Sequence, residues 1–303
     1  QVRNIEDVLR DVPGVAVAIT AGQTQLRLRG SEANHVLVLV DGIEVSDPFA
    51  GEFDVGTLQA EIGSRIEVLR GPQSALYGSD SIGGVVAYES GRFDGVSAFL
   101  EGGTNKTING AVRLGVIGES WNGSLSAVAV STGGEPNARD GNRDIGRDSY
   151  TLSGKAENEL APGFAVRASG RFTRTQGEFN EQNFSLAAVV DPTFGFVIDS
   201  PDTRFENEAI YALVGVNLEA MGGDWKHDLS AQLADIGRDT FGPFGRTSGS
   251  NGDRLKASYV SSARLGEGHS LTFAADWERE RFRNDDPFDF AFTGRRSIEN
   301  VGL

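Results

Sequence analysis

The sequence predicts a small mixed α/β domain followed by an antiparallel sheet of membrane β-barrel strands. Short apolar runs separated by turn signals fill residues 4–88, whereas the residues after Glu89 alternate polar and apolar side chains with a period of two. After a first short link, the connections between these alternating segments are in turn short and long, as in outer-membrane barrels. We therefore divide the chain into an N-terminal domain at 1–90 and a barrel region at 91–303.

The composition of the 303-residue chain excludes several kinds of protein. It contains no cysteine, so neither a disulfide framework nor a thiolate metal site is possible. Its formal net charge of −15 argues against a nucleic-acid partner, because phosphate binding requires clustered Lys and Arg. No stretch approaches the roughly 20 apolar residues that a membrane-spanning helix needs. Any membrane-spanning part of this chain must therefore be built from strands.

The N-terminal domain is expected to begin with a short helix, which Asn4 caps and Pro13-Gly14 ends. Residues 36–40 are continuously apolar, which indicates a strand buried on both faces. The other expected elements are strands at 15–19 and 25–29, an irregular loop at 43–56, a helical turn at 57–62, and a strand, compact turn and strand from Ile66 to Val86.

The barrel region contains nine alternating segments and the beginning of a tenth. Phe164, Val166 and Ala168 fall on one face of their segment, opposite Ala165 and Arg167. The segments lie at 94–102, 107–118, 121–131, 148–159, 164–174, 205–219, 225–238, 255–265, 271–278 and from about 297. Charged residues within them are expected to face a wet lumen, namely Lys155, Glu157, Arg167, Arg171, Asp276 and Glu278. The solvated face of a soluble sheet is the alternative interpretation.

The lengths of the connections indicate a membrane barrel more specifically than the alternation within the segments does. Tight links are expected at 118–120, 161–163, 220–224 and 266–268, and long loops at 132–147, 175–204, 239–253 and 283–296. Outer-membrane barrels have short periplasmic turns and longer extracellular loops, whereas soluble sandwiches have no reason to sort loop lengths in this way. Aromatic residues near the two kinds of connection are candidate girdles: Trp121, Phe164 and Trp225 beside tight turns, and Tyr150, Phe172, Trp277 and Phe282 near long loops.

Four motifs in the first 90 residues resemble, in the same order, the plug domain of TonB-dependent outer-membrane transporters. They are Leu9 to Val15 with its Pro13-Gly14, Leu28-Arg29-Gly30, Val36 to Gly42, and Ile66 to Val86. The stretches Asn34 to Leu39 and Tyr77 to Val86 are most similar to the vitamin B12 (cobalamin) transporter group.

The resemblance implies a receptor in the cell outer membrane of a Gram-negative bacterium that is not an enzyme. It would import cobalamin or a ferric siderophore by ligand binding and plug rearrangement, driven by a TonB-type energy-coupling protein of the inner membrane. Its partners would also include outer-membrane lipid. In this family the plug sits inside a 22-stranded barrel. Ten segments supply less than half of such a barrel, so we expect the chain to be a fragment of a longer protein.

The resemblance also implies where ligand binds. The first plug apex corresponds to residues 46–52, with Ser46, Asp47, Phe49 and Gly51 as candidate ligand contacts, and the second to residues 77–80, with Tyr77, Ser79 and Asp80. Arg29 and Arg70 match family Arg-Gly positions whose guanidinium groups meet barrel carboxylates. The alternative is that both arginines are solvated strand residues.

Asp140, Asp144 and Asp148 have a spacing that could gather oxygen ligands for Ca²⁺. A solvated acidic loop is the competing interpretation, since the glycine geometry of a dedicated calcium loop is missing. No other cofactor is expected. Two further function classes stay open at this point: a passive porin or adhesin-type barrel, and a soluble β-rich binding protein.

Overall fold

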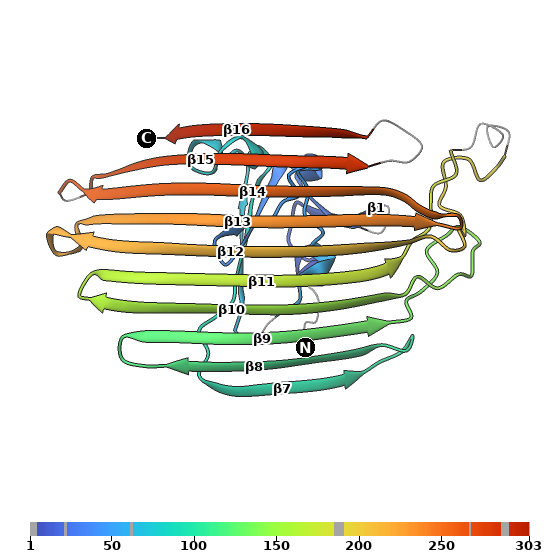
Figure 1. Ribbon diagram of the computed structural model, residues 1–303, viewed down its shortest axis with the longest axis horizontal. Coiled ribbons are helices and arrows are strands. Elements are labelled where there is room, and N and C mark those ends of the chain that lie inside the picture. The colour runs from blue at the N-terminus through green and yellow to red at the C-terminus, as the bar shows by residue number, and fades with distance from the viewer. Residues whose placement is uncertain are drawn as a thin grey trace.

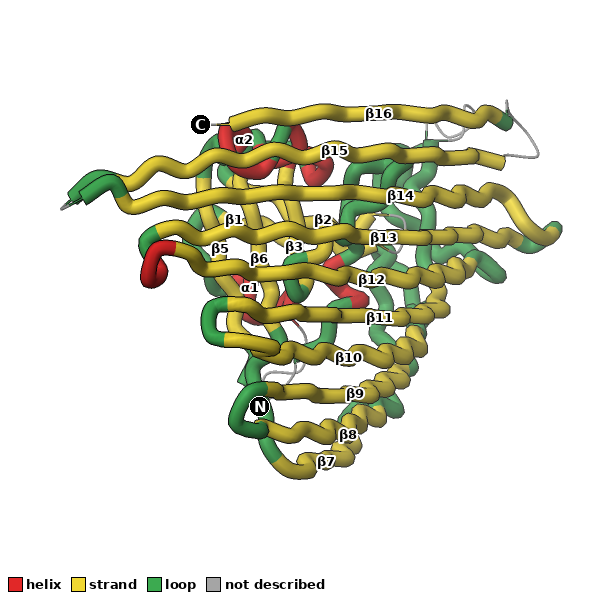
Figure 2. Tube along the Cα trace, turned by 60° about the vertical axis from the view of Figure 1, so that its left-hand side comes forward, coloured by secondary structure: helices red, strands yellow, loops and turns green. Residues whose placement is uncertain are grey.

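The computed structural model describes residues 5–20, 23–60, 63–184, 191–266, 268–285 and 291–302. A ten-stranded antiparallel sheet forms one layer, and the N-terminal domain lies against one face of it (Figures 1 and 2). None of the helices in the described part of the chain is long and apolar enough to cross a membrane.

The N-terminal domain contains a hairpin, a four-stranded sheet and short helices. Its elements are α1 (Ile5–Arg10), β1 (Val15–Thr20), β2 (Gln23–Leu28), η1 (Ala33–His35), β3 (Val36–Val40), β4 (Ile43–Glu44), η2 (Val55–Thr57), β5 (Arg65–Arg70), α2 (Ser74–Tyr77), η3 (Ser79–Ser81) and β6 (Gly84–Glu89). The four-stranded sheet has the order β4-β3-β6-β5, and β3 runs parallel to β6. Four of the five residues of β3 are buried, as its apolar run predicts.

The large sheet contains every alternating segment that the sequence predicts. Its strands are β7 (Gly95–Gly102), β8 (Ile108–Ile117), β9 (Trp121–Thr132), β10 (Arg147–Ala161), β11 (Phe164–Glu178), β12 (Arg204–Ala220), β13 (Trp225–Gly242), β14 (Gly245–Arg264), β15 (Ser270–Asp285) and β16 (Phe292–Gly302). Successive side chains alternate between its faces: Thr151 is 4% exposed and the next residue, Leu152, is 55% exposed. The inward face holds the N-terminal domain, and the sheet does not close on itself.

The core of the N-terminal domain continues into the large sheet. Buried residues such as Leu9, Val38 and Tyr88 form one apolar cluster with Tyr211 and Leu213 of β12. Apolar surface removed from water contributes about 25 cal/mol per Å². This shared cluster therefore fixes the domain against β12 and its neighbour β13.

The connections of the large sheet define two rims. The loop rim carries the long connections 133–146 and 179–203 together with short ones at 103–107 and 243–244, and the turn rim carries short connections such as that at Met221–Gly223 (Figure 1). The predicted long loop at 239–253 is wrong, because β13 and β14 continue through it in paired register and turn at residues 243–244. The Gly, Ser and Asn residues of this segment are typical of loops, but backbone hydrogen bonds to the facing strand hold them in an extended conformation.

The aromatic girdle prediction holds in part. Tyr150 is 55% exposed near the loop rim and Trp121 is 49% exposed near the turn rim. Phe282 is the exception, because its ring contacts Phe49 of the N-terminal domain and therefore lies on the inward face. The period of two explains this, since Phe282 is in phase with the buried Glu280 rather than with Trp277.

Candidate functional site at the two apex loops

The first apex loop, residues 46–52, is a compact turn built around Asp47. The Asp47 carboxylate accepts hydrogen bonds from the backbone N–H groups of Phe49 and Ala50, at 2.6 and 3.1 Å. The Gly51 N–H donates to the Asp47 carbonyl, and Gly51 has a φ of +72°, which favours glycine. Burial raises the pKa of Asp47, and the two backbone hydrogen bonds oppose that rise.

The tip of this loop contacts the large sheet near the loop rim. The Phe49 ring lies 5.8 Å from that of Phe282 in β15 and 5.6 Å from that of Phe292 in β16. Pro48 packs directly on Gly252 of β14, where a Cβ would lie 2.9 Å from the proline Cδ. The first apex is therefore seated on three neighbouring strands.

The second apex, residues 77–80, joins the end of α2 to η3. Gly78 turns the chain with a φ of +83° and lies against Asn300 of β16. The Asp80 carboxylate lies 3.8 Å from the guanidinium of Arg296 in the same strand. Tyr77 and Ser79 flank Gly78 in the backbone, so both apices adjoin β16.

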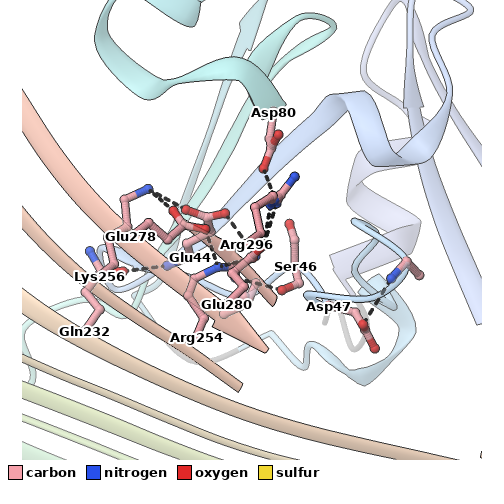
Figure 3. A network of polar contacts seen from close by, with 12 residues as sticks. Glu44, Ser46, Asp47, Asp80, Gln232, Arg254, Lys256, Glu278, Glu280 and Arg296 are labelled. Atoms are coloured by element: carbon pink, nitrogen blue, oxygen red, sulfur yellow. Dashed lines mark hydrogen bonds and ion pairs between the residues drawn. The ribbon is translucent and has the colours of Figure 1, made fainter. Parts of the chain in front are cut away.

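A buried network of charges underlies the first apex (Figure 3). Arg254 of β14 is 2% exposed, and it donates to the Ser46 carbonyl at 2.8 Å and pairs with Glu44 at 3.3 Å. Its guanidinium also pairs with Glu280 at 2.6 Å and Glu278 at 3.0 Å, both in β15. Charge-assisted bonds of this kind are stronger than neutral ones, and the low local dielectric strengthens them further.

Two further cations complete the network (Figure 3). Lys256 lies 2.6 Å from Glu44 and 3.3 Å from Glu278. Arg296 pairs with Glu280 at 2.6 Å and with Asp80 at 3.8 Å, so it joins the network to the second apex. A continuous chain of polar contacts therefore connects the two apex loops through the large sheet. It begins with the hydrogen bond from Arg254 to the Ser46 carbonyl and continues through the ion pairs of Glu280 and Arg296 to Asp80.

Glu44 is ionised within this network. Burial alone would raise its pKa, but Arg254 and Lys256 together hold the pKa below the ordinary value of 4.5. The Gln232 side chain also accepts a hydrogen bond from the Glu44 backbone N–H, at 3.1 Å. The carboxylate thus anchors β4 to β14, and the backbone N–H anchors it to β13.

We expect the stability that Glu44 contributes to be lost only in acid. A lowered folded pKa means that the contribution is complete above pH 4.5 and falls as the pH drops below it. The difference in unfolding free energy between the parent protein and Glu44→Gln should therefore still be present at about pH 5 and shrink as the pH falls further. Denaturant titrations at several pH values measure it. A difference that shrinks already above about pH 5 would contradict the assignment.

Two other ion pairs between the N-terminal domain and the sheet distribute their charges in the same way as the apex network. Arg147 of β10 pairs with Asp54 at 3.5 Å, and Lys155 of the same strand pairs with Asp41 at 3.7 Å. As in the apex network, the cation belongs to the sheet and the carboxylate to the N-terminal domain. The inward face of the sheet is therefore matched in charge to an acidic domain.

Arg29 and Arg70, the two arginines predicted to contact barrel carboxylates, do not belong to the apex network. Arg70 donates to the carbonyl of Pro13 at 2.8 Å, inside the N-terminal domain. The side chain of Arg29 approaches Gly14 and Gly71, also inside the domain. Their predicted contact with barrel carboxylates stays a prediction. The charged contacts between sheet and domain use Arg147, Lys155, Arg254, Lys256 and Arg296 instead. Of these, only Lys155 is among the residues that the alternation predicts to face the lumen.

The predicted calcium site stays a prediction, and the structure does not bring its three aspartates together. In the described part of the chain, no three His, Cys, Asp or Glu side chains come close enough to hold a metal, so Asp140, Asp144 and Asp148 are not gathered. The Asp140 side chain is 95% exposed, and Asp148 lies in β10. An arginine holds the loops instead: Arg143 donates to the Phe179 carbonyl at 2.7 Å and to Asn180 at 3.0 Å.

Comparisons with known proteins agree with this architecture. Residues 1–85 match the family described as TonB-dependent Receptor Plug Domain. The vitamin B12 transporter BtuB of Vibrio vulnificus is 45% identical over 83 residues, which are 26% of this chain and 14% of that protein.

Solved structures match over nearly the whole chain. The siderophore receptor PirA of Acinetobacter baumannii has a TM-score of 0.70 at 17% identity, covering 95% of this chain and 47% of that one. A mutant of the ferric enterobactin receptor PfeA of Pseudomonas aeruginosa has a TM-score of 0.72 at 17% identity, covering 98% and 52%. The chain thus spans about half the length of these structures. Residues 1–85 thus match the plug domain of TonB-dependent receptors, and the ten antiparallel strands that follow have the fold of part of the β-barrel wall of these structures.

Proposed function

We propose that the complete protein is an outer-membrane receptor that imports cobalamin or a ferric siderophore by energy-coupled movement of its plug. One observation carries this proposal: the plug covers the inward face of the wall and is held there by noncovalent polar contacts at both apex loops, a hydrogen bond from Arg254 to the Ser46 carbonyl and an ion pair between Arg296 and Asp80. Such a plug blocks passive flow and can still be displaced. Relatives named for vitamin B12 and for enterobactin give the two ligand classes.

The geometry favours ligand capture at the loop rim. Phe49 is 38% exposed and Phe292 is 45% exposed, so part of their shared aromatic surface remains open beside the apices. We assign the loop rim to the outside of the cell and the turn rim to the periplasm, following the loop lengths of outer-membrane barrels. A TonB-type protein would supply the energy from the inner membrane. No covalent chemistry on the ligand is required.

The experiment is uptake by cells that produce the complete protein. We expect binding of radiolabelled cyanocobalamin or ferric enterobactin without energy, and import only when the inner membrane is energised. A passive porin would instead conduct small solutes freely in planar bilayers, which would overturn the proposal. Recovery of the protein in the soluble fraction without detergent would favour a soluble binding protein.

A further inference from the structure

A cavity at the loop rim lies between the plug and strands β9, β10 and β11, and we call it the acidic cavity. Its volume is about 540 Å³, within the usual range for ligand sites. Residues of α1 and η2 line its plug side, residues of the three strands line its wall side, and the long loops 133–146 and 179–203 contribute further lining residues. None of its described lining residues belongs to an apex loop, so the cavity is separate from the candidate site described above.

Four carboxylates line the acidic cavity. Glu6 belongs to α1, Glu178 ends β11, and Glu135 and Glu181 are exposed residues of the long loops. Arg143 pairs with Glu178 at 3.3 Å. In the part of the chain that the structure describes, no Lys or Arg pairs with the other three. The lining therefore carries more negative charge than its surroundings neutralise.

Arg147 is the one cation among the described lining residues, and its charge is balanced by a residue outside the lining. It pairs with Asp54 of the plug at 3.5 Å, and its guanidinium carbon lies 6.0 Å from the centre of the Phe205 ring. The carboxylates of the cavity would thus repel an anion and attract a cation.

Two buried oxygen atoms of the lining, Oε1 of Gln59 and Oε2 of Glu6, accept no hydrogen bond from any described residue. Gln59 is 4% exposed. The Ile5 N–H donates to the Leu58 carbonyl at 3.3 Å, which holds α1 beside the segment that carries Gln59. A buried acceptor without a donor costs free energy, and native structures rarely leave one. A ligand that brings N–H donors into the cavity would satisfy these acceptors.

The rest of the lining favours an organic cation over a metal ion. Among the described residues, no three His, Cys, Asp or Glu side chains come close enough to hold a metal. Val130, Phe179 and Val197 add apolar surface to the lining. An alkyl chain can pack on such surface, and an ammonium head carries three N–H donors. The lining therefore matches an ammonium group on an aliphatic chain.

We propose that the acidic cavity binds an aliphatic ammonium group, which belongs either to a free polyamine or to the amine arm of a ferric chelate. The ammonium head donates to Gln59 Oε1 and to the Glu6 carboxylate, and the chain packs on the apolar side chains. Glu135 and Glu181 attract the cation from the loop rim. This site is separate from the apices, so equilibrium binding tests it whether or not the receptor imports cobalamin or a ferric siderophore.

The first probe is cadaverine, a linear aliphatic diamine, and the corresponding diol is its neutral match. Calorimetric titration of the purified complete protein at about 0.15 M salt weakens diffuse attraction to an acidic surface, because the Debye length is then about 8 Å. We expect one cadaverine to bind saturably per protein and the diol to show no binding. No saturable binding of cadaverine, or equal affinity for the diol, would overturn the proposal.

Glu6→Gln keeps the shape of the side chain and removes its charge, so it should weaken cadaverine binding by about tenfold. Asp140→Asn is the matched control, because it removes one charge from a side chain that is 95% exposed and outside the lining. It should bind within about twofold of the parent. Glu135→Gln, whose amide oxygen can keep the hydrogen bond from Asn105, should weaken binding by about threefold and decides the question if Glu6→Gln does not fold. Parent affinity in both glutamine variants would contradict the site.

The two sources of the ammonium group are separated by competition. Ferrioxamine B is a ferric trihydroxamate with a free aminopentyl arm, and its N-acetyl derivative lacks the charge. If the arm of a chelate is the source, ferrioxamine B displaces cadaverine and the N-acetyl derivative does not. If a free polyamine is the source, cadaverine stays bound in the presence of both chelates. Equal displacement by the N-acetyl derivative would overturn the assignment of an ammonium site.

Discussion

Replacing Arg254 with alanine is expected to lower the free energy of unfolding of the complete receptor by about 3–5 kcal/mol. The side chain is buried among Glu44, Glu278 and Glu280, and it also bonds the Ser46 carbonyl. Removing it leaves buried carboxylates without their main counter-charge, which is among the most destabilising changes a protein can undergo. Denaturant titration of the protein in detergent measures the change.

Arg264→Ala is the matched control for this experiment. Arg264 lies on the same strand, β14, but its pair with Asp224 is exposed, at 70% and 56% for the two side chains. Exposed pairs contribute at most about 1 kcal/mol, so the control should change the unfolding free energy little. Losses of equal size in the two variants would show that the buried network does not hold the plug.

Replacing Glu280 with glutamine is expected to weaken ligand binding by about tenfold or more, because two arginines depend on this one carboxylate. Glu280 is fully buried and accepts hydrogen bonds from Arg254 at 2.6 Å and from Arg296 at 2.7 Å. Glutamine keeps the shape but turns amide N–H groups toward one guanidinium. Arg296 then loses the anchor that holds it beside Asp80, so the second apex loses its position.

Glu299→Gln provides the comparison for ligand binding. It makes the same chemical change one strand away, on the exposed side of β16. Titration of the complete receptor with ferric enterobactin and cyanocobalamin gives the dissociation constants. If Glu280→Gln binds both probes as tightly as the parent, Arg296 does not position the apex.

The wall could be predicted well from the amino-acid sequence because a single physical rule governs it. Alternation with a period of two places Thr151 inward and Leu152 outward whatever the neighbouring strand is. The apolar run of β3 was equally informative, because a strand covered on both faces needs apolar side chains throughout. The predicted loop at 239–253 failed, since composition alone does not reveal that a polar segment finds a strand partner.

The charged network could not be read from spacing along the chain, because Lys256 and Glu44 are separated by 212 residues. One part of the charged network can nevertheless be recognised in the sequence. Arg254 and Lys256 alternate in phase on one segment, as Glu278 and Glu280 do on the next, and the register pairs Arg254 with Glu280 and Lys256 with Glu278. Opposite charges in phase on adjacent barrel segments therefore indicate a wall site. The partner from the plug still requires the three-dimensional fold.

The measurement that tests the account most directly is uptake by a receptor whose first apex is tied to the wall. A Cβ on Gly252 would lie 3.1 Å from the Cβ of Pro48, close to the separation of about 3.5–4.5 Å in disulfides. The double variant Pro48→Cys with Gly252→Cys should therefore form a disulfide, and residues 1–303 contain no other cysteine that could compete for it. We expect the oxidised receptor to bind its ligand but to import none, and reduction to restore import. Import at the parent rate with the disulfide intact would contradict a mechanism in which the plug must leave the wall.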